Sequence, residues 1–217
     1  MACRTMAPPE FDAAFVHRLD TLLAWRRDVR RFRPDPIDED MLRACLAAAH
    51  RAPSVGNSRP WRFVRVSDPA RREAVTASFS ACNAAAAEGY AGERAARYRA
   101  LKLAGLREAP VHLAVFCDGG TAAGLGLGRH TMPETLDYSV VGAVQVLWLA
   151  ARARGLGLGW VSILDPCAVT AILAVPPGWR LVAYLCLGLP QEEHPDPELE
   201  RHGWQAEDPS GAELYER

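Results

Sequence analysis

The spacing of hydrophobic residues along the chain predicts helices and strands that alternate from one end to the other. Apolar positions three or four residues apart are typical of helices, and they recur over residues 11–25, 38–50, 70–105, 136–154 and 165–173. Continuous or alternating apolar runs are typical of strands, and they occupy residues 62–66, 111–117, 158–162 and 180–187. Because few strands accompany many helices, we expect an α+β fold with a small mixed or antiparallel sheet wrapped by helices.

Two of the predicted helical stretches carry further information. Residues 70–105 are weakly apolar and are divided by a break at residues 89–92, so their second part, approximately residues 84–105, is either a helical lid over a site or an ordinary surface hairpin. Helix 136–154 is apolar nearly all round, and we expect it to be the buried core helix. The length suits a single domain over residues 1–217.

Composition narrows the class of protein. The 25 Lys and Arg residues balance 26 Asp and Glu residues, so no overall basic field favours binding to nucleic acid. The six cysteines are scattered without a CxxC pair, which indicates small buried side chains in a reducing compartment, and they are Cys3, Cys45, Cys82, Cys117, Cys167 and Cys186. No secretory signal is apparent, and the most apolar run, residues 140–151, is too short to span a bilayer. We therefore expect a soluble, cytoplasmic protein.

Several common chemistries find no support in the motifs. The Gly-Leu-Gly-Leu-Gly run at 155–159 follows a helix and precedes a strand, which is the reverse of the dinucleotide-binding order. The chain has no P-loop and no GxSxG nucleophile motif. The histidines show no HExxH spacing, so no metal site is expected.

The run Arg26-Arg27-Asp28-Val29-Arg30 is the strongest chemical signal in the chain. Guanidinium groups match phosphate oxygens, so the run indicates an anion clamp. A carboxylate weakens such a clamp, and Asp28 therefore needs another role, such as orienting an arginine or handling a proton. A polar loop over residues 52–61 ends in a Pro-Trp corner. Together the two segments suggest a flat, phosphorylated, aromatic ligand.

These motifs resemble those of the nitroreductase superfamily. The run at 26–30 is similar to its N-terminal flavin clamp, where usual members carry serine in place of Asp28, and the Pro-Ser-x-x-Asn-x-x-Pro-Trp loop at 53–61 is similar to its flavin-contact loop. Asp28, the segment 92–103 and the Gly-Trp-Val-Ser run at 159–162 more narrowly resemble a branch of the superfamily that fragments its flavin. The resemblance spans roughly residues 18–204.

The resemblance implies that reduced FMN is a substrate, which O2 helps to cleave to 5,6-dimethylbenzimidazole, the lower-ligand base of vitamin B12, and D-erythrose 4-phosphate. In such a site Asp28 would accept a proton near the ribityl chain, Ser162 would donate or accept a hydrogen bond on the opposite wall, and the lid would exclude water. Arg26 and Arg30 would hold the phosphate. The FMN-binding residues implied by the resemblance are Arg26, Arg27, Asp28, Val29, Arg30, Pro53, Ser54, Val55, Gly56, Ser58, Leu101, Gly157, Leu158 and Gly159.

The resemblance also implies partners. Members are homodimers with flavin at the subunit interface, and helix 136–154 is the candidate for dimer packing. A separate flavin reductase would supply the reduced FMN. Two other functions stay open, an FMN-dependent NAD(P)H reductase of nitroaromatics or quinones and a non-catalytic flavin-binding protein. Asn57 matches the ordinary nitroreductase pattern and keeps the reductase open, whereas Asp28 and the lid argue against it.

Overall fold

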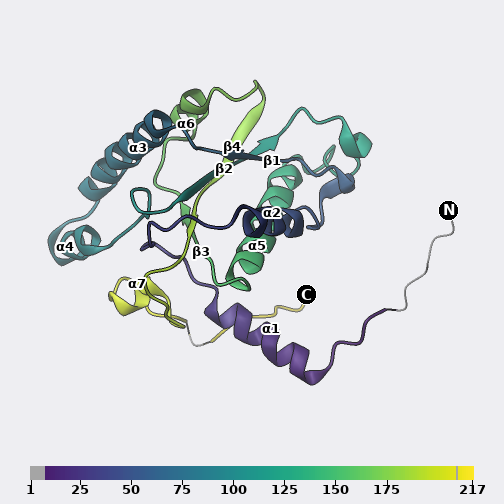
Figure 1. Ribbon diagram of the computed structural model, residues 1–217, viewed down its shortest axis with the longest axis horizontal. Coiled ribbons are helices and arrows are strands. Elements are labelled where there is room, and N and C mark those ends of the chain that lie inside the picture. The colour runs from purple at the N-terminus through teal and green to yellow at the C-terminus, as the bar shows by residue number, and fades with distance from the viewer. Residues whose placement is uncertain (1–7, 209) are drawn as a thin grey trace.

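A four-stranded antiparallel sheet forms the centre of the molecule. The computed structural model describes residues 8–208 and 210–217. The strands are β1 (Trp61–Arg65), β2 (Val111–Asp118), β3 (Gly157–Val161) and β4 (Trp179–Gly188), in the spatial order β1-β2-β4-β3. Each adjacent pair is antiparallel. Figure 1 shows helices on both sides of this sheet, which confirms the α+β prediction.

The helices begin and end close to where the sequence predicts. They are α1 (Ala13–Trp25), α2 (Glu39–Ala49), α3 (Pro69–Glu88), α4 (Gly92–Ala100), α5 (Thr135–Arg152), α6 (Pro166–Leu173) and α7 (Glu198–Arg201), with 3₁₀ turns η1 (Val55–Asn57) and η2 (Ala123–Gly126). Asp38, Asp68 and Asp165 cap α2, α3 and α6, because each carboxylate accepts hydrogen bonds from backbone N–H groups of the first turn. The predicted break between α3 and α4 lies at residues 89–91, whereas α7 was not predicted.

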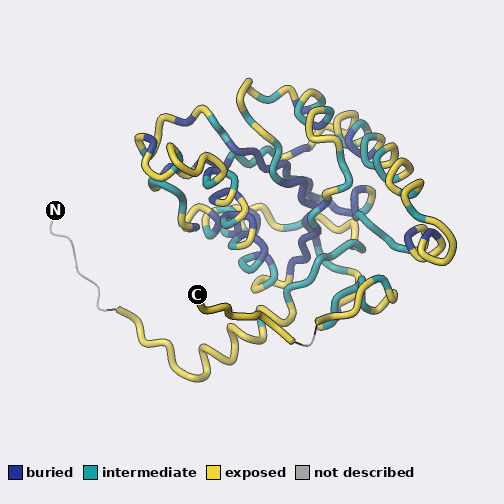
Figure 2. Tube along the Cα trace, turned by 180° about the vertical axis from the view of Figure 1, so that it is seen from behind, coloured by how far each residue is buried: buried dark blue, intermediate teal, exposed yellow. Residues whose placement is uncertain are grey.

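Two hydrophobic clusters cover the two faces of the sheet. Side chains alternate along β2, so that Leu113 and Val115 pack against α2 and α5, whereas Ala114 and Phe116 pack in a second cluster with residues of α3 and α6. Because both faces are covered, β2 is buried over almost its whole length. Figure 2 shows the buried strands at the centre of the molecule.

Two helices, α1 and α5, have apolar residues that the described part of the chain leaves exposed. Helix α5 buries eight residues in the core, as expected of the core helix, but leaves Tyr138 and Val141 on its outer side exposed. Helix α1 has no buried residue, and its Leu19 and Leu23 side chains are exposed. Figure 2 shows α1 exposed over most of its length. A helical repeat of apolar residues indicates that one face of the helix is buried. It does not indicate whether the same chain or a second copy buries that face.

The structure also tests the expectations that the cysteines are buried thiols and that no segment spans a membrane. Cys45, Cys117 and Cys186 are buried free thiols, as expected, whereas Cys167 is exposed. Burial raises the pKa of the Cys186 thiol to about 12. Cys3 lies outside the described residues. Within the residues that the structure describes, no helix combines the length and hydropathy that a membrane span requires.

Candidate active site

The segment after α1 runs beside strand β3. The Val29 N–H donates a hydrogen bond to the Leu158 carbonyl at 3.0 Å, and Asp28 and Leu158 form a parallel bridge. Gly159 permits this approach, because a Cβ there would lie 2.1 Å from the Val29 carbonyl oxygen. Gly157 packs against the Val29 side chain in the same way. The glycines of β3 therefore admit the chain's own backbone, and their contact with a flavin ring stays a prediction.

The Asp28 carboxylate is held from two sides. Its Oδ1 accepts a hydrogen bond from the Trp160 backbone N–H at 2.8 Å, and its Oδ2 accepts one from Arg30 Nε at 2.8 Å. Burial raises the pKa of the Asp28 carboxyl above its ordinary value, opposed by the Arg30 charge and by the Trp160 N–H. A carboxylate that is fixed in place and more basic than usual is suited to accept a proton.

The arginines of the run at 26–30 differ in the groups that they bond. Arg30 bonds both Asp28 and the Lys102 carbonyl, the latter at 3.0 Å from Nη1. The Arg26 guanidinium lies 4.7 Å from the centre of the Trp148 ring, and Arg27 Nε donates to the Pro195 carbonyl at 2.7 Å. Neither Arg26 nor Arg27 is ion-paired with a carboxylate of the described residues. These two guanidinium groups therefore remain available to an anion.

A cavity of about 200 Å³ lies beside Arg30. Ser162, directly after β3, lines it together with Trp160, and Leu101 lines it from the segment that follows α4. Asp28 lies on the other side of Arg30, in a narrow cleft of about 40 Å³ shared with Arg27. The structure thus brings the 26–30 run, Leu101, strand β3 and Ser162 into one region, with Arg30 between the two hollows.

The predicted loop at 53–58 lies elsewhere. The Val55 N–H donates to Ser139 Oγ on α5 at 3.0 Å, and a Cβ on Gly56 would lie 3.0 Å from the Gly124 carbonyl of η2. Gly56 has a φ of 55°, a left-handed conformation that glycine adopts without strain. Figure 1 places η1 and η2 together at one end of the molecule, on the far side of α5 from β3 and α4. One chain therefore does not bring the two predicted halves of the flavin site together.

Within this loop, two serines differ in their bonding. The Ser54 hydroxyl accepts a hydrogen bond from the Arg59 N–H at 3.0 Å. The Ser58 side chain is buried at 5 % exposure, and its Oγ has no hydrogen-bond partner in the described part of the chain. A buried hydroxyl without a partner is costly, so Ser58 is suited to bond a ligand that the chain alone does not supply.

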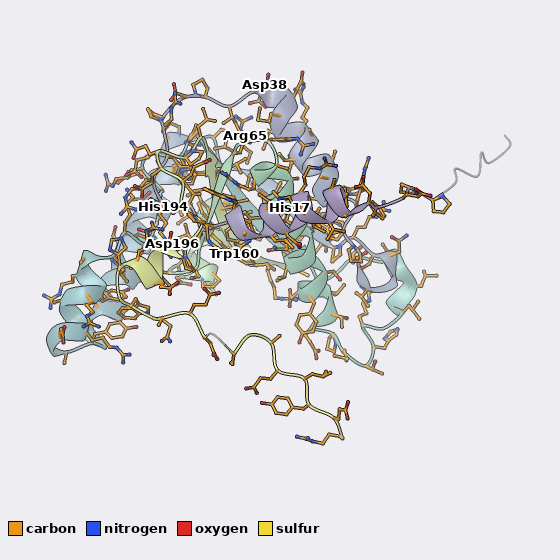
Figure 3. All side chains as sticks on the ribbon, turned by 90° about the horizontal axis from the view of Figure 1, so that it is seen from below. His17, Asp38, Arg65, Trp160, His194 and Asp196 are labelled. Carbon is orange, nitrogen blue, oxygen red and sulfur yellow. The ribbon has the colours of Figure 1, made fainter. Side chains whose placement is uncertain are left out.

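The C-terminal segment contributes residues that the sequence analysis missed. The Glu198 side chain is 9 % exposed, and its Oε1 accepts a hydrogen bond from Arg31 at 2.7 Å. Its other oxygen lies 4.0 Å from Arg30 Nε. Trp204 lines the cavity beside Ser162. His194 and Asp196 of the same segment, labelled in Figure 3, line the cleft that also contains Asp28. The sequence offered one indication of this contact: residues 192–200 are rich in acids, whereas residues 26–33 are rich in arginines.

Comparisons with known proteins agree with this geometry. The sequence model described as the nitroreductase family matches residues 23–189. The 5,6-dimethylbenzimidazole synthase of Rhodospirillum rubrum is 62% identical over 201 residues, which cover 93% of this chain and 95% of that protein. The enzyme of the same name from Rhodobacter capsulatus is 53% identical over 90% of this chain and 94% of its own length. A crystal structure of iodotyrosine deiodinase bound to FMN and 3-iodo-L-tyrosine is similar at a TM-score of 0.69 and 27% identity, over 81% of this chain and 91% of that one.

Proposed function

We propose a function for this chain from one premise: it belongs to the nitroreductase family. The function is that of a 5,6-dimethylbenzimidazole synthase, an oxidoreductase that fragments reduced FMN in the presence of O2. The identity of 62% over nearly the full length of both chains supports this activity. D-erythrose 4-phosphate is the second product in this proposal.

The observation that carries the proposal is the Asp28 carboxylate. It stands inside an arginine cluster where an ordinary flavin clamp needs no acid, and backbone and side-chain donors fix both of its oxygens. Electron transfer through a bound flavin requires no such base, whereas fragmentation of the ribityl chain requires proton removal. Asp28 therefore accepts a proton from the substrate, and Ser162 is its hydrogen-bonding counterpart on the wall of the neighbouring cavity.

The residues present fit FMN. Arg30, expected to hold the phosphate with Arg26, already bonds Asp28 and the Lys102 carbonyl. Arg26 and Arg27 supply guanidinium groups that no carboxylate of the described chain pairs with, and these suit the phosphate. The buried, unpartnered Ser58 hydroxyl suits a polar group of the flavin. When bound, reduced FMN supplies the electrons that O2 accepts. Tyr98 of the lid helix α4 and Leu101 line the cavity beside Ser162, and in this proposal they keep water from it.

The complete site is formed by two copies of the chain. The run at 26–30 and the loop at 53–58 lie apart within one chain, and a cavity of about 200 Å³ is too small for a whole FMN. The exposed apolar faces of α1 and α5 supply a surface for a second copy. In a homodimer, the loop of one copy completes the clamp of the other. A separate flavin reductase as the source of reduced FMN and a cytoplasmic location stay predictions.

The test is a single-turnover reaction. Purified protein is mixed with reduced FMN under nitrogen, air is admitted, and the products are separated and identified by mass. We expect 5,6-dimethylbenzimidazole, and none when O2 is withheld. Quantitative return of oxidised FMN without the benzimidazole would overturn the proposal. In that case NADH oxidation with a nitroaromatic acceptor tests the reductase, and binding of FMN without either product indicates a flavin-binding protein.

A further inference from the structure

The turn after α7 lies against the lid helix α4. The Trp204 ring packs edge-on against Tyr90, with ring centres 5.3 Å apart, and lies 5.9 Å from Tyr98 of α4. Tyr90 and Tyr98 stack on each other at 4.8 Å. The backbone adds a polar contact, because Arg97 Nη1 donates to the Gly203 carbonyl at 3.2 Å. The lid is therefore fastened to the C-terminal segment by an aromatic cluster, which we call the latch (Tyr90, Tyr98 and Trp204).

The same segment is fastened to the arginine cluster at its other end. Glu198 is the first residue of α7, and its carboxylate lies between Arg30 and Arg31. Arg30 in turn bonds Asp28 at 2.8 Å. A short segment, residues 198–204, thus connects the proposed base at one end with the lid at the other. Pairing with two guanidinium groups offsets the cost of burying the Glu198 carboxylate.

The lid and the C-terminal segment both line the cavity beside Ser162. Tyr98 and Leu101 come from the lid, and Leu199 and Trp204 come from the C-terminal segment. Trp204 contacts the lid and lines the cavity at once, so its loss opens a wall and releases the lid together. Aromatic pairs of this geometry add stability beyond the area that they bury. Neither the run at 26–30 nor the loop at 53–58 contributes to this contact between the lid and the C-terminal segment.

We propose that Trp204 is a positioning residue that holds the lid closed over the cavity during fragmentation of reduced FMN. This inference rests on the proposed function. Without the latch, the lid opens to water, and two electrons and two protons pass from reduced FMN to O2 to give oxidised FMN and hydrogen peroxide. The latch therefore decides between fragmentation and simple reoxidation, while Asp28 supplies the base for the former.

The first experiment measures the lid without any flavin. Hydrogen exchange of backbone amides over residues 92–100 is followed in the wild type, Trp204→Ala and Trp204→Phe. We expect exchange to increase about tenfold in Trp204→Ala and to stay near the wild-type rate in Trp204→Phe, which keeps an aromatic ring. Tyr215→Ala is the matched control, because Tyr215 is an exposed aromatic residue of the same C-terminal region outside the latch. Unchanged exchange in Trp204→Ala would overturn the inference.

The second experiment measures how reduced FMN is divided between the two outcomes. Benzimidazole and hydrogen peroxide are quantified after air is admitted, and we expect their ratio to fall about tenfold in Trp204→Ala and to recover in Trp204→Phe. Flavin binding and the melting temperature of each variant are also recorded, because an unfolded variant would bind no flavin and would melt at a lower temperature than the wild type. If the wild type makes no benzimidazole, the proposed function fails. If the wild type makes it and Trp204→Ala keeps the same ratio, only the latch fails.

Discussion

At the scale of single residues, the proposed reaction depends on the Asp28 carboxylate as its base. An ionised carboxylate offers about four lone-pair directions, and the Trp160 N–H and Arg30 occupy two of them. No other donor among residues 8–208 and 210–217 bonds this carboxylate, so it can receive a proton without breaking either bond. A serine at this position has one shorter-reaching hydroxyl in place of two carboxylate oxygens and would not accept a proton at neutral pH.

Substitution of Asp28 by asparagine tests this role. The amide keeps the shape of the side chain and one hydrogen bond, but it is no longer a base. We expect benzimidazole formation to fall by roughly 100- to 10,000-fold, the usual contribution of general base catalysis, while FMN still binds. The measurement is single-turnover product yield with flavin binding followed by fluorescence. Undiminished product in this variant would remove Asp28 from the mechanism.

At the scale of elements, strand β3 can lie against the run at 26–30 because Gly157 and Gly159 have no side chain. It is an edge strand, and the run at 26–30 lies along its free edge. Covering a free edge in this way also protects it from pairing with other chains. The positions of Asp28, Trp160 and Ser162 relative to one another therefore depend on two glycines that carry no chemistry.

Substitution of Gly159 by alanine tests this dependence. The added Cβ would lie 2.1 Å from the Val29 carbonyl, so either β3 or the 28–30 segment has to move. We expect a loss of about 1–3 kcal/mol in the free energy of unfolding and a loss of product yield. Gly89→Ala is the control, because the nearest atom, the Ala86 carbonyl oxygen, is 3.4 Å away and its φ is −71°. Equal stability of the two variants would contradict the packing argument.

The pairing of strands β2 and β4 carries a buried polar contact with a pH dependence. His112 Nδ1 lies 3.0 Å from the Tyr184 hydroxyl, and burial lowers the pKa of His112 from 6.5 to about 4. Between these values the unfolded chain binds a proton that the folded chain refuses, so stability falls as the pH falls. The loss amounts to about 3 kcal/mol over the whole interval.

The check is urea unfolding of the wild type and His112→Gln at several pH values from 7 to 4. We expect the variant to be less stable at pH 7, because the buried contact is altered, but to lose less stability on acidification. Parallel pH profiles would show that another group causes the acid dependence.

The sequence predicted local features better than distant ones. The helix spacing of α2 and the continuous apolar run of β2 depend on neighbouring residues, and both elements were predicted. The arginine run and Asp28 were recognisable because the chemistry lies in consecutive residues. Glu198 and Trp204 were missed, because they reach the site through contacts such as Arg31 to Glu198, 167 residues apart. No local pattern encodes which distant carboxylate meets which guanidinium.

At the scale of the whole molecule, the incomplete site and the uncovered apolar faces point to the same conclusion. The loop at 53–58 contacts Ser139 near the start of α5, whereas the run at 26–30 contacts Trp148 near its end. The outer face of α5 carries the exposed Tyr138 and Val141. A surface of this kind, with the apolar face of α1 beside it, is of the type that buries about 1,200–2,000 Å² in a stable pair. Whether a helix packs within its own chain or against a copy was beyond the sequence pattern.

Substitution of Val141 by glutamate tests the assembly. A charge placed in an apolar interface without a partner disfavours association. We expect sedimentation velocity to show a monomer, and FMN affinity to fall by more than about tenfold, because the second half of the site is lost. Leu214→Glu, at a side chain that is 89% exposed near the C-terminus, is the control. A monomeric variant that binds FMN normally would place the whole site in one chain.

The hydrogen bond between Asp28 and Trp160 spans 132 residues, and this has a consequence for the order of events during synthesis. A ribosome that adds about 5–20 residues per second needs roughly ten seconds to pass from one partner to the other. Helix α1 is the first described helix to emerge, yet it has no buried residue within its own chain, so its docking waits for the rest. Contacts between residues so far apart in the sequence form slowly. A chain that ends before Trp160 therefore has the arginines but lacks the backbone N–H that holds Asp28, and under the proposed function it would not fragment reduced flavin.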